Sequence, residues 1–306
     1  MSFSGEMKEE IARLIPMQEA DVRAELSAII RFCGRIIRLE DSVAVLVETE
    51  NVALAKTFVK LIKKAFDIQV QLEIRRHGAG KNNQYFILLS ERPEDMLYSE
   101  ELPERQKLQQ ALRDICIWSA QAEPRDVLQT LGSKRAYIRG AFLCAGSMSD
   151  PGKSYHFEIV CNGQEKAEEL QSLLTAYEID AKIVMRKKHY VVYVKEGSQI
   201  VELLGLTGAH VSLMQLENVR IVKEMRNSVN RKVNCETANL NKTVSAAVRQ
   251  VEDIRFIQRT TGLQDLSESL GEMARLRLEH PDASLKELGN MLVPPVGKSG
   301  VNHRLR

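Results

Sequence analysis

Cysteine pairs, long apolar runs and low-complexity tracts are all missing from this sequence of 306 residues. The longest apolar runs, such as residues 43–47, are far shorter than the roughly 20 residues that a membrane-spanning helix needs. The N-terminal stretch mixes acids into its apolar positions and so lacks the apolar core of a signal peptide. The cysteines are an odd, scattered set without a Cys-x-x-Cys pair, which argues against a zinc site or a disulfide framework and fits a reducing cytosol: Cys33, Cys116, Cys144, Cys161 and Cys235. We therefore expect a soluble, cytoplasmic protein with no membrane segment, cofactor or bound metal.

Aromatic residues are few, at 5%, yet 44% of the residues are hydrophobic and their periodicity runs nearly end to end, which excludes a disordered chain. At roughly 100–200 residues per domain, the length predicts two or three domains. The net charge of +2 is unevenly divided. Residues 220–306 hold 15 Lys and Arg against 10 Asp and Glu (+5), and residues 1–219 hold 28 against 31 (−3). A basic C-terminal segment favours nucleic-acid binding localised there.

The first two thirds of the chain contain an internal repeat. Residues 26–36 (LSAIIRFCGRI) and 138–148 (IRGAFLCAGSM) are both apolar helical stretches that end in a glycine, Gly34 and Gly146. After each glycine come alternating runs, then a helix-period run (52–66 and 165–179), then two more alternating runs (68–76 with 84–90, and 181–194). Each copy therefore predicts the order helix, strand, strand, helix, strand, strand. We expect the copies to pack as a pseudo-dimer through small residues that let two helices approach: Ser27, Ala28, Gly140, Ala141 and Ala145.

These two segments resemble degenerate copies of the LAGLIDADG motif of homing endonucleases. Aligned on the final glycine, residues 26–34 and 138–146 take the nine places of the motif. The resemblance implies a saddle-shaped, pseudo-twofold α+β domain of two αββαββ repeats, with the two motif helices paired at its centre.

The departures from the motif predict that catalysis is lost. The family's metal-binding carboxylate stands just before the final glycine, where this chain has Cys33 and Ala145, and an earlier acid is replaced by Arg31 and Leu143. A thiol and a methyl group cannot hold the Mg²⁺ that phosphodiester hydrolysis needs. Nearby acids are more simply solvated surface residues: Glu40, Asp41, Asp150 and Glu158. We expect no enzyme activity.

Basic residues on the predicted saddle strands are interleaved with acids. The candidates are Arg35, Arg38, Arg75, Arg76, Lys81, Arg186, Lys187 and Lys188, and the acids among them are Glu40, Glu48 and Glu73. A sheet that grips DNA should be more one-sided in charge. The saddle therefore has two open interpretations, an auxiliary DNA contact or a surface that docks a protein.

From about Thr207 the pattern is entirely helical, with helices predicted over 211–260 and 266–281. Ser284 is a candidate N-cap, and Glu287 three residues later completes a capping box. The short helix that follows has Leu285, Leu288 and Leu292 on its inner face and ends before the turn at 293–295. A second helix begins near Lys298 or Ser299. This order predicts a helix-turn-helix, although a small three-helix packing or dimerisation unit gives the same pattern.

The residue types around this turn suit duplex DNA. Arginine can bond guanine with two hydrogen bonds, asparagine can do so with adenine, and serine or lysine can bind phosphate. The predicted DNA-binding residues are Ser284, Lys286, Lys298, Ser299, Asn302, His303, Arg304 and Arg306. If Arg304 reads a base, replacing it with alanine should weaken binding by about 1–3 kcal/mol.

A second polar feature precedes this region. Asn227, Asn230 and Asn234 share one face of the predicted long helix beside Arg231. Asparagine is only a middling helix former, so such a stripe suggests specific hydrogen bonding. Two interpretations stay open: contact with phosphates or bases, or a polar seam that fixes the angle between domains.

Over essentially its whole length, the chain is similar to the WhiA family of bacterial regulators. Three long strings carry the resemblance: residues 135–160, 227–243 and 284–306. It implies a DNA-binding protein that joins a catalytically silent LAGLIDADG-like domain to a helix-turn-helix and acts in sporulation, or in cell division and chromosome segregation. We expect repeats at 1–92 and 131–206, a connecting segment at 93–130, and a helical DNA-binding domain at 207–306 with its helix-turn-helix at about 284–306.

The expected partner is double-stranded DNA, with the protein associated with the nucleoid in the cytoplasm. The alternative function is a protein-interaction adaptor whose saddle docks RNA polymerase or another transcription or division factor.

Overall fold

A computed structural model of the chain describes residues 2–38, 43–68, 70–76, 83–90, 107–115 and 127–306. Glu40, Asp41, Lys81 and Cys116 lie outside the described residues, as does most of the predicted connecting segment. The chain forms two compact units, residues 1–221 and 222–306. Among the described helices, none is long and apolar enough to cross a membrane.

The first unit contains the predicted repeat. After α1 (Phe3–Ile11), the first copy consists of α2 (Glu19–Cys33), β1 (Gly34–Arg38), β2 (Val43–Thr49), α3 (Val52–Phe66), β3 (Gln71–Arg76) and β4 (Asn83–Ser90). A further helix spans 107–115. The second copy consists of α5 (Leu131–Ala145), β5 (Gly146–Met148), β6 (Phe157–Cys161), α6 (Gln164–Thr175), β7 (Lys182–Arg186) and β8 (His189–Val194).

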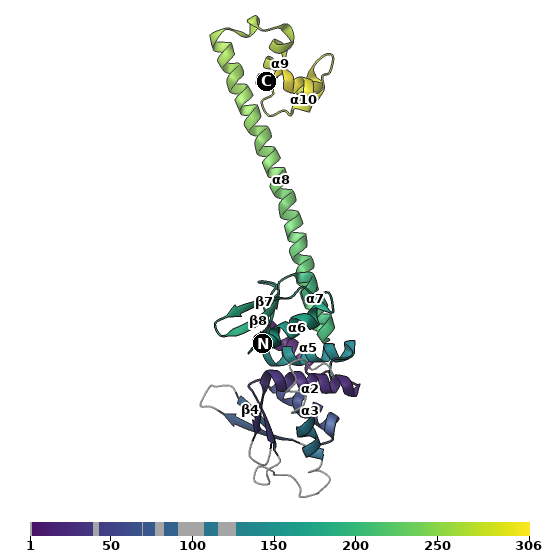
Figure 1. Cartoon of the computed structure of the whole chain (residues 1–306). Coiled ribbons are helices and arrows are strands. Elements are labelled where there is room, and N and C mark those ends of the chain that lie inside the picture. Colours follow the sequence, from purple (N-terminus) through teal and green to yellow (C-terminus); the bar gives the residue numbers. More distant parts are fainter. Residues whose placement is uncertain (1, 39–42, 69, 77–82, 91–106, 116–126) are drawn as a thin grey trace. The chain divides into compact units, whose positions relative to one another are not determined.

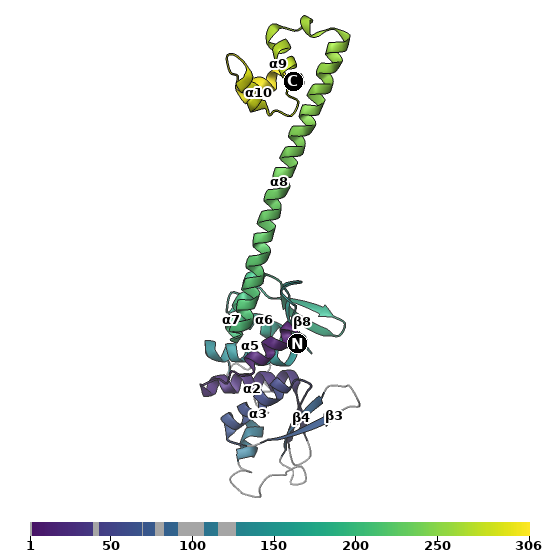
Figure 2. The ribbon, with the colours of Figure 1, turned by 180° about the vertical axis from the view of Figure 1, so that it is seen from behind.

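The two sheets have the same topology. Their strand orders are β1-β2-β4-β3 and β5-β6-β8-β7, and every neighbouring pair is antiparallel. Figures 1 and 2 both show α2 and α5 side by side, with one half of the repeat on each side of them. The predicted α+β, pseudo-twofold, LAGLIDADG-like fold is confirmed.

Close contact between α2 and α5 depends on small residues. Ser27, Ala28 and Ala141 are buried, and a Cβ added at Gly140 would come within 2.8 Å of the Glu25 carbonyl oxygen and 2.9 Å of the Ala28 Cβ. The glycines that end the two motifs, Gly34 and Gly146, are required for a similar steric reason. An added Cβ would lie 2.6 Å from the Ile30 carbonyl oxygen at Gly34, and 2.1 Å from the Phe142 ring at Gly146. Helix and strand can therefore meet directly only because these side chains are absent.

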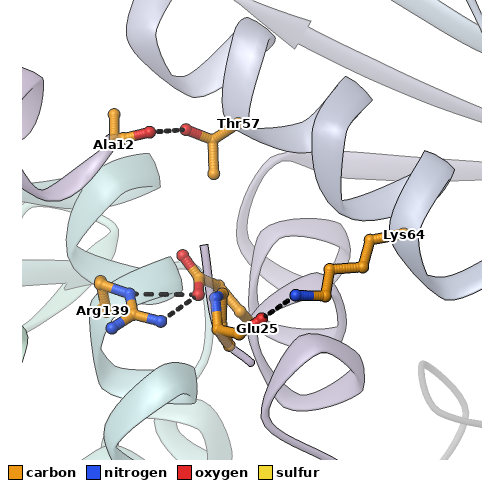
Figure 3. A network of polar contacts seen from close by, with 6 residues as sticks. Ala12, Glu25, Thr57, Lys64 and Arg139 are labelled. Carbon is orange, nitrogen blue, oxygen red and sulfur yellow. Dashed lines mark hydrogen bonds and ion pairs between the residues drawn. The ribbon is translucent and has the colours of Figure 1, made fainter. Parts of the chain in front are cut away.

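A polar network is buried within this apolar core (Figure 3). Arg139 of α5 donates from Nε to the Glu25 carboxylate of α2 at 3.1 Å, and its Nη2 donates to the same oxygen. The Thr57 hydroxyl donates to the Ala12 carbonyl oxygen at 3.0 Å. Burial raises the pKa of Glu25, and the hydrogen bonds from Arg139 offset part of that rise. This pair ties the two halves of the repeat together.

Helical structure begins earlier than the sequence suggested, at α7 (Gly197–Thr207) rather than at about Thr207. Ile200, Leu203 and Leu204 of α7 are buried in the core of the first unit, so this apolar helix belongs with the repeat. The long predicted helix is α8 (His210–Thr260), and the boundary between the two units falls within it.

The C-terminal part of the second unit is a small helical bundle. It contains a 3-10 turn η1 (Leu263–Asp265), then α9 (Glu268–Glu279), α10 (Leu285–Met291) and α11 (Lys298–Arg304). Its core consists of Met273, Leu288, Leu292 and Val301, and Leu285 packs against it half-buried. The predicted helix-turn-helix is confirmed, with its second helix starting at Lys298.

Candidate nucleic-acid interface

The C-terminal ends of α2 and α5 form the place where a homing endonuclease would hold its metal. Cys33 is the last residue of α2 and Ala145 the last of α5. Lys8 of α1 lies close enough to interact electrostatically with the thiols of Cys33 and Cys144, and burial lowers its pKa. A hydrogen bond from the Cys144 thiol lowers the pKa of Cys33. Two thiols, a methyl group and a lysine do not fit Mg²⁺, which prefers oxygen ligands.

Among the described residues, the other charged groups of the motif region have partners elsewhere. Arg31, which replaces the motif's earlier acid, forms a buried ion pair with Glu169 of α6 at 2.6 Å. Asp150 is exposed and accepts a hydrogen bond from the Gly152 backbone at 2.8 Å. Among the described residues, no cluster of three or more His, Cys, Asp or Glu is arranged to hold a metal ion.

The saddle strands bring their cations next to carboxylates. On the first sheet, Arg75 Nε lies 2.8 Å from a Glu73 carboxylate oxygen, and the guanidinium sits 4.6 Å from the centre of the Phe86 ring. On the second sheet, Arg186 lies 3.0 Å from Glu158, whose same oxygen contacts His156 at 2.9 Å. These arginines are locally neutralised and offer little net attraction to a phosphate backbone.

The remaining saddle cations are spread out. Arg35 is exposed on β1, and Lys187 and Lys188 are exposed at the turn between β7 and β8. The side chains of Arg38 and Arg76 lie outside the described part of the structure. The described saddle strands therefore hold no uninterrupted cationic surface.

The helix-turn-helix is shaped by its cap and its turn. The Ser284 hydroxyl accepts from the Glu287 backbone at 3.3 Å, and the Glu287 carboxylate accepts from the Ser284 backbone at 2.7 Å, which is the predicted capping box. The Ser284 backbone N–H lowers the pKa of Glu287. The turn returns so closely that a Cβ added at Gly289 would lie 2.0 Å from the Val296 carbonyl oxygen. The capping box fixes where α10 begins, and the close approach at Gly289 brings the turn back against α10.

A pocket of about 450 Å³ lies in the second unit between α8 and the helix-turn-helix. Four predicted DNA-binding residues line it, namely Ser284, Lys286, Lys298 and Asn302. The α8 wall adds Lys242, Thr243 and Gln250, which the sequence prediction missed. Three lysines and Arg277 line the pocket, and none of its lining residues is an acid.

The other predicted residues of α11 are distributed around the helix. Ser299 and His303 are exposed, as is Arg306 just beyond the helix end. Arg304 is half-buried and, at 100° per residue, stands about 200° around α11 from Asn302. Asn302 and Ser299 therefore share a face that Arg304 does not.

On α8, the side chains of Asn227, Asn230, Arg231 and Asn234 are all exposed. Their helical spacing places them on one side of α8, as the sequence indicated. Within the second unit they stand free of the pocket, whose α8 residues begin at Lys242.

Known protein families match this chain along most of its length. Three family models fit successive stretches: the WhiA N-terminal LAGLIDADG-like domain at residues 19–102, the WhiA LAGLIDADG-like domain at 134–226, and the WhiA C-terminal HTH domain at 229–306. A relative from Lachnoclostridium phytofermentans, described as a probable cell division protein WhiA, is 49% identical over 309 residues, covering 100% of this chain and 96% of the relative. A protein with the same description from Clostridium botulinum strain Hall is 46% identical with the same coverage.

The crystal structure of full-length WhiA from Thermatoga maritima has the same fold, with a TM-score of 0.61 at 24% identity over 100% of this chain and 95% of that one. The chain has two LAGLIDADG-like halves and a helix-turn-helix, and WhiA family models and WhiA relatives match it along its length. This chain belongs to the WhiA family.

Proposed function

We propose that this protein is a DNA-binding regulator that recognises duplex DNA through its helix-turn-helix. The observation that carries the proposal is the pocket rim, where Lys286 and Lys298 stand beside Asn302 without an acid among the lining residues. Lysines there would bind phosphates and fix the register, and Asn302 with Ser299 would face the base edges. The pocket is too small for a duplex, so the duplex would lie across its rim.

The two relatives are described as probable cell division proteins, which points to a role in cell division. We propose the same role here, exerted on DNA in the cytoplasm, with sporulation genes as a further class of target. Regulation of this kind requires recognition of particular sequences, which distinguishes the proposal from general DNA compaction.

Selection of duplexes from a random pool by the full chain tests this function. We expect an enriched sequence that binds far more tightly than a scrambled duplex in fluorescence anisotropy. We also expect a Lys286→Ala/Lys298→Ala variant to bind both duplexes more weakly, since phosphate contacts act on any sequence. Failure to enrich any sequence, or unchanged binding by the double variant, contradicts the proposal.

We further propose that the saddle does not hydrolyse DNA. A half-buried lysine and two thiols occupy the region where carboxylates would hold the metal, so the negative charge that binds a divalent cation is missing there. The full chain should leave supercoiled plasmid intact in Mg²⁺ or Mn²⁺. Cleavage that a Lys8→Ala substitution abolishes would overturn this assignment.

A second candidate function, protein docking by the saddle, is favoured by the neutralised arginines of its sheets. Arg75 paired with Glu73 and Arg186 paired with Glu158 suit a mixed-charge protein surface better than a phosphate backbone. Removing residues 222–306 separates the two functions. A docking protein should still bind purified RNA polymerase after the truncation, whereas a protein that acts only through DNA should bind neither polymerase nor DNA.

A further inference from the structure

The pocket between α8 and the helix-turn-helix gathers positive charge without a counter-charge. Its four cations are Lys242, Lys286, Lys298 and Arg277, and no acid lines it. No ion pair joins any of the four to a carboxylate of the described residues. An anion placed in the pocket would be attracted by all four at short range. The pocket is therefore suited to a ligand with several negative charges.

Arg277 supplies the charge that water reaches least. The residue is 2% exposed, and its Nη1 donates to the carbonyl oxygens of Pro281 at 3.3 Å and Ala283 at 2.7 Å. Its Nε is buried without a hydrogen-bond partner in the described structure. Burial lowers the pKa of Arg277, since the charged form has lost its hydration. A buried charge without a partner is unfavourable, and an anion in the pocket would compensate it.

Gln250 adds a different requirement to the same pocket. Its side-chain Oε1 is buried without a hydrogen-bond partner in the described structure, so a ligand that fits should bring a donor. An ionised phosphate offers no donor, whereas a sugar hydroxyl or a base N–H does. Ala246, Ala247 and Leu285 form an apolar wall. The pocket thus combines cations that suit phosphate with an acceptor and an apolar wall that suit the rest of a nucleotide.

We propose that this pocket binds a nucleoside di- or triphosphate, with its phosphates among the four cations and its nucleoside against Gln250 and the apolar wall. A phosphate monoester carries a charge of about −1.5 to −2 at neutral pH, so a chain of phosphates matches four cations better than a carboxylate does. The pocket volume of about 450 Å³ lies within the roughly 300–1,000 Å³ of small-molecule sites.

A DNA duplex cannot use the whole of this site. Its phosphodiesters lie on the outside of a rod too wide for the pocket, so they reach the exposed Lys286 and Lys298 and not the buried Arg277. A terminal phosphate, attached on one side only, can enter. The nucleotide and the duplex would still share the two exposed lysines. If the proposed DNA-binding function holds, on which this step rests, each ligand lowers the affinity of the other by the same factor.

Isothermal titration calorimetry of the full chain without DNA tests the site. We expect saturable binding of ATP or GTP at about 0.15 M salt. Lys242→Ala should weaken that binding about tenfold or more, because one charge-assisted hydrogen bond is lost. The matched control is Lys232→Ala, which removes an exposed lysine of α8 outside the pocket and should bind as the wild type does. Absence of binding by both nucleotides, or equal effects of the two substitutions, overturns the proposal.

Inorganic triphosphate tests whether the pocket recognises the nucleoside as well as the phosphates. Gln250→Met removes the buried acceptor and keeps a side chain of similar length that suits a helix. It should weaken nucleotide binding several-fold and leave the binding of inorganic triphosphate nearly unchanged. Circular dichroism verifies that the variant keeps its helix. Equal weakening of both ligands, or a wild-type chain that binds inorganic triphosphate as tightly as the nucleotide, would overturn the nucleoside assignment.

Fluorescence anisotropy with the selected duplex tests the competition. At constant ionic strength the nucleotide should lower the DNA affinity of the wild type and of Lys232→Ala, and about tenfold more nucleotide should be needed for Lys242→Ala. DNA affinity that is unchanged or raised by saturating nucleotide contradicts the competition. A chain that binds nucleotide but no duplex contradicts the proposed function and leaves the nucleotide site standing. A chain that binds the duplex but neither nucleotide assigns the cations to the DNA backbone and overturns the site.

Discussion

Arg139 decides whether the Glu25 carboxylate can stay charged between the two halves of the repeat. The Glu25 side chain is fully buried. The guanidinium of Arg139 donates two hydrogen bonds to its carboxylate. Burial of a charge without a partner is strongly unfavourable, whereas removal of both charges often costs little. The pair therefore matters less for net stability than for preventing an isolated charge.

Replacing Arg139 with methionine should lower the free energy of unfolding by about 3–5 kcal/mol at neutral pH. The folded-state pKa of Glu25 already lies above its ordinary value of 4.5 and should rise further in the variant. The folded state then holds a proton that the unfolded state has lost, so stability falls as the pH rises from 4.5 through the raised pKa. Denaturant unfolding at several pH values measures this.

The companion variant Glu25→Gln/Arg139→Met removes both charges and should recover most of the loss. A loss of stability in Arg139→Met that is the same at every pH would show that the charge on Glu25 is not its cause.

Asn302 and Arg304 can be compared as readers of a base. Asn302 lies on the face of α11 that carries Ser299, and Arg304 is half-buried on another side. Asn302→Ala should weaken binding to the selected duplex by about 1–3 kcal/mol and leave binding to scrambled DNA nearly unchanged. Arg304→Ala should have a smaller effect. Fluorescence anisotropy with both duplexes measures the difference, and the reverse ranking would assign the base contact to Arg304.

At the scale of the elements, the α10–α11 turn tolerates little change. Because an added Cβ at Gly289 would meet a backbone oxygen at 2.0 Å, Gly289→Ala should destabilise the bundle by about 3 kcal/mol or more. Gly297→Ser is the matched control, since nothing lies within 4 Å of an added Cβ there and serine suits an N-cap. Thermal unfolding followed by circular dichroism measures both. Equal melting temperatures would mean that the turn relaxes at little cost.

For the whole molecule, the dependence of DNA affinity on salt reports which unit holds the duplex. Lys286→Ala/Lys298→Ala should reduce the slope of log affinity against log salt by about 2, one unit for each phosphate contact. Arg75→Ala/Arg186→Ala should leave the slope unchanged, because both arginines are already paired with carboxylates. If the saddle variant shows the larger change, the saddle is the principal DNA contact.

Much of the fold could be predicted from the sequence. The repeat, the motif-ending glycines at 34 and 146, the capping box at Ser284 and the start of α11 at Lys298 all depend on neighbouring residues, so local patterns carry them. The first helix of the chain and α7 were missed, because nothing in a short amphipathic segment says where it packs. The candidate site was predicted only along α10 and α11. Lys242, more than 40 residues earlier in the chain, joins the same pocket through tertiary contact.

The sequence by itself determined the two-copy architecture, the loss of the metal-binding acids and the polar character of the last helix, since each follows from residue types at fixed spacings. Only the tertiary structure decided how charges are partnered. It paired Arg75 and Arg186 with carboxylates and set Lys8 beside two thiols. The physical reason is that burial and electrostatic interaction depend on distance through space, which linear spacing does not fix beyond a turn of helix or a pair of strands.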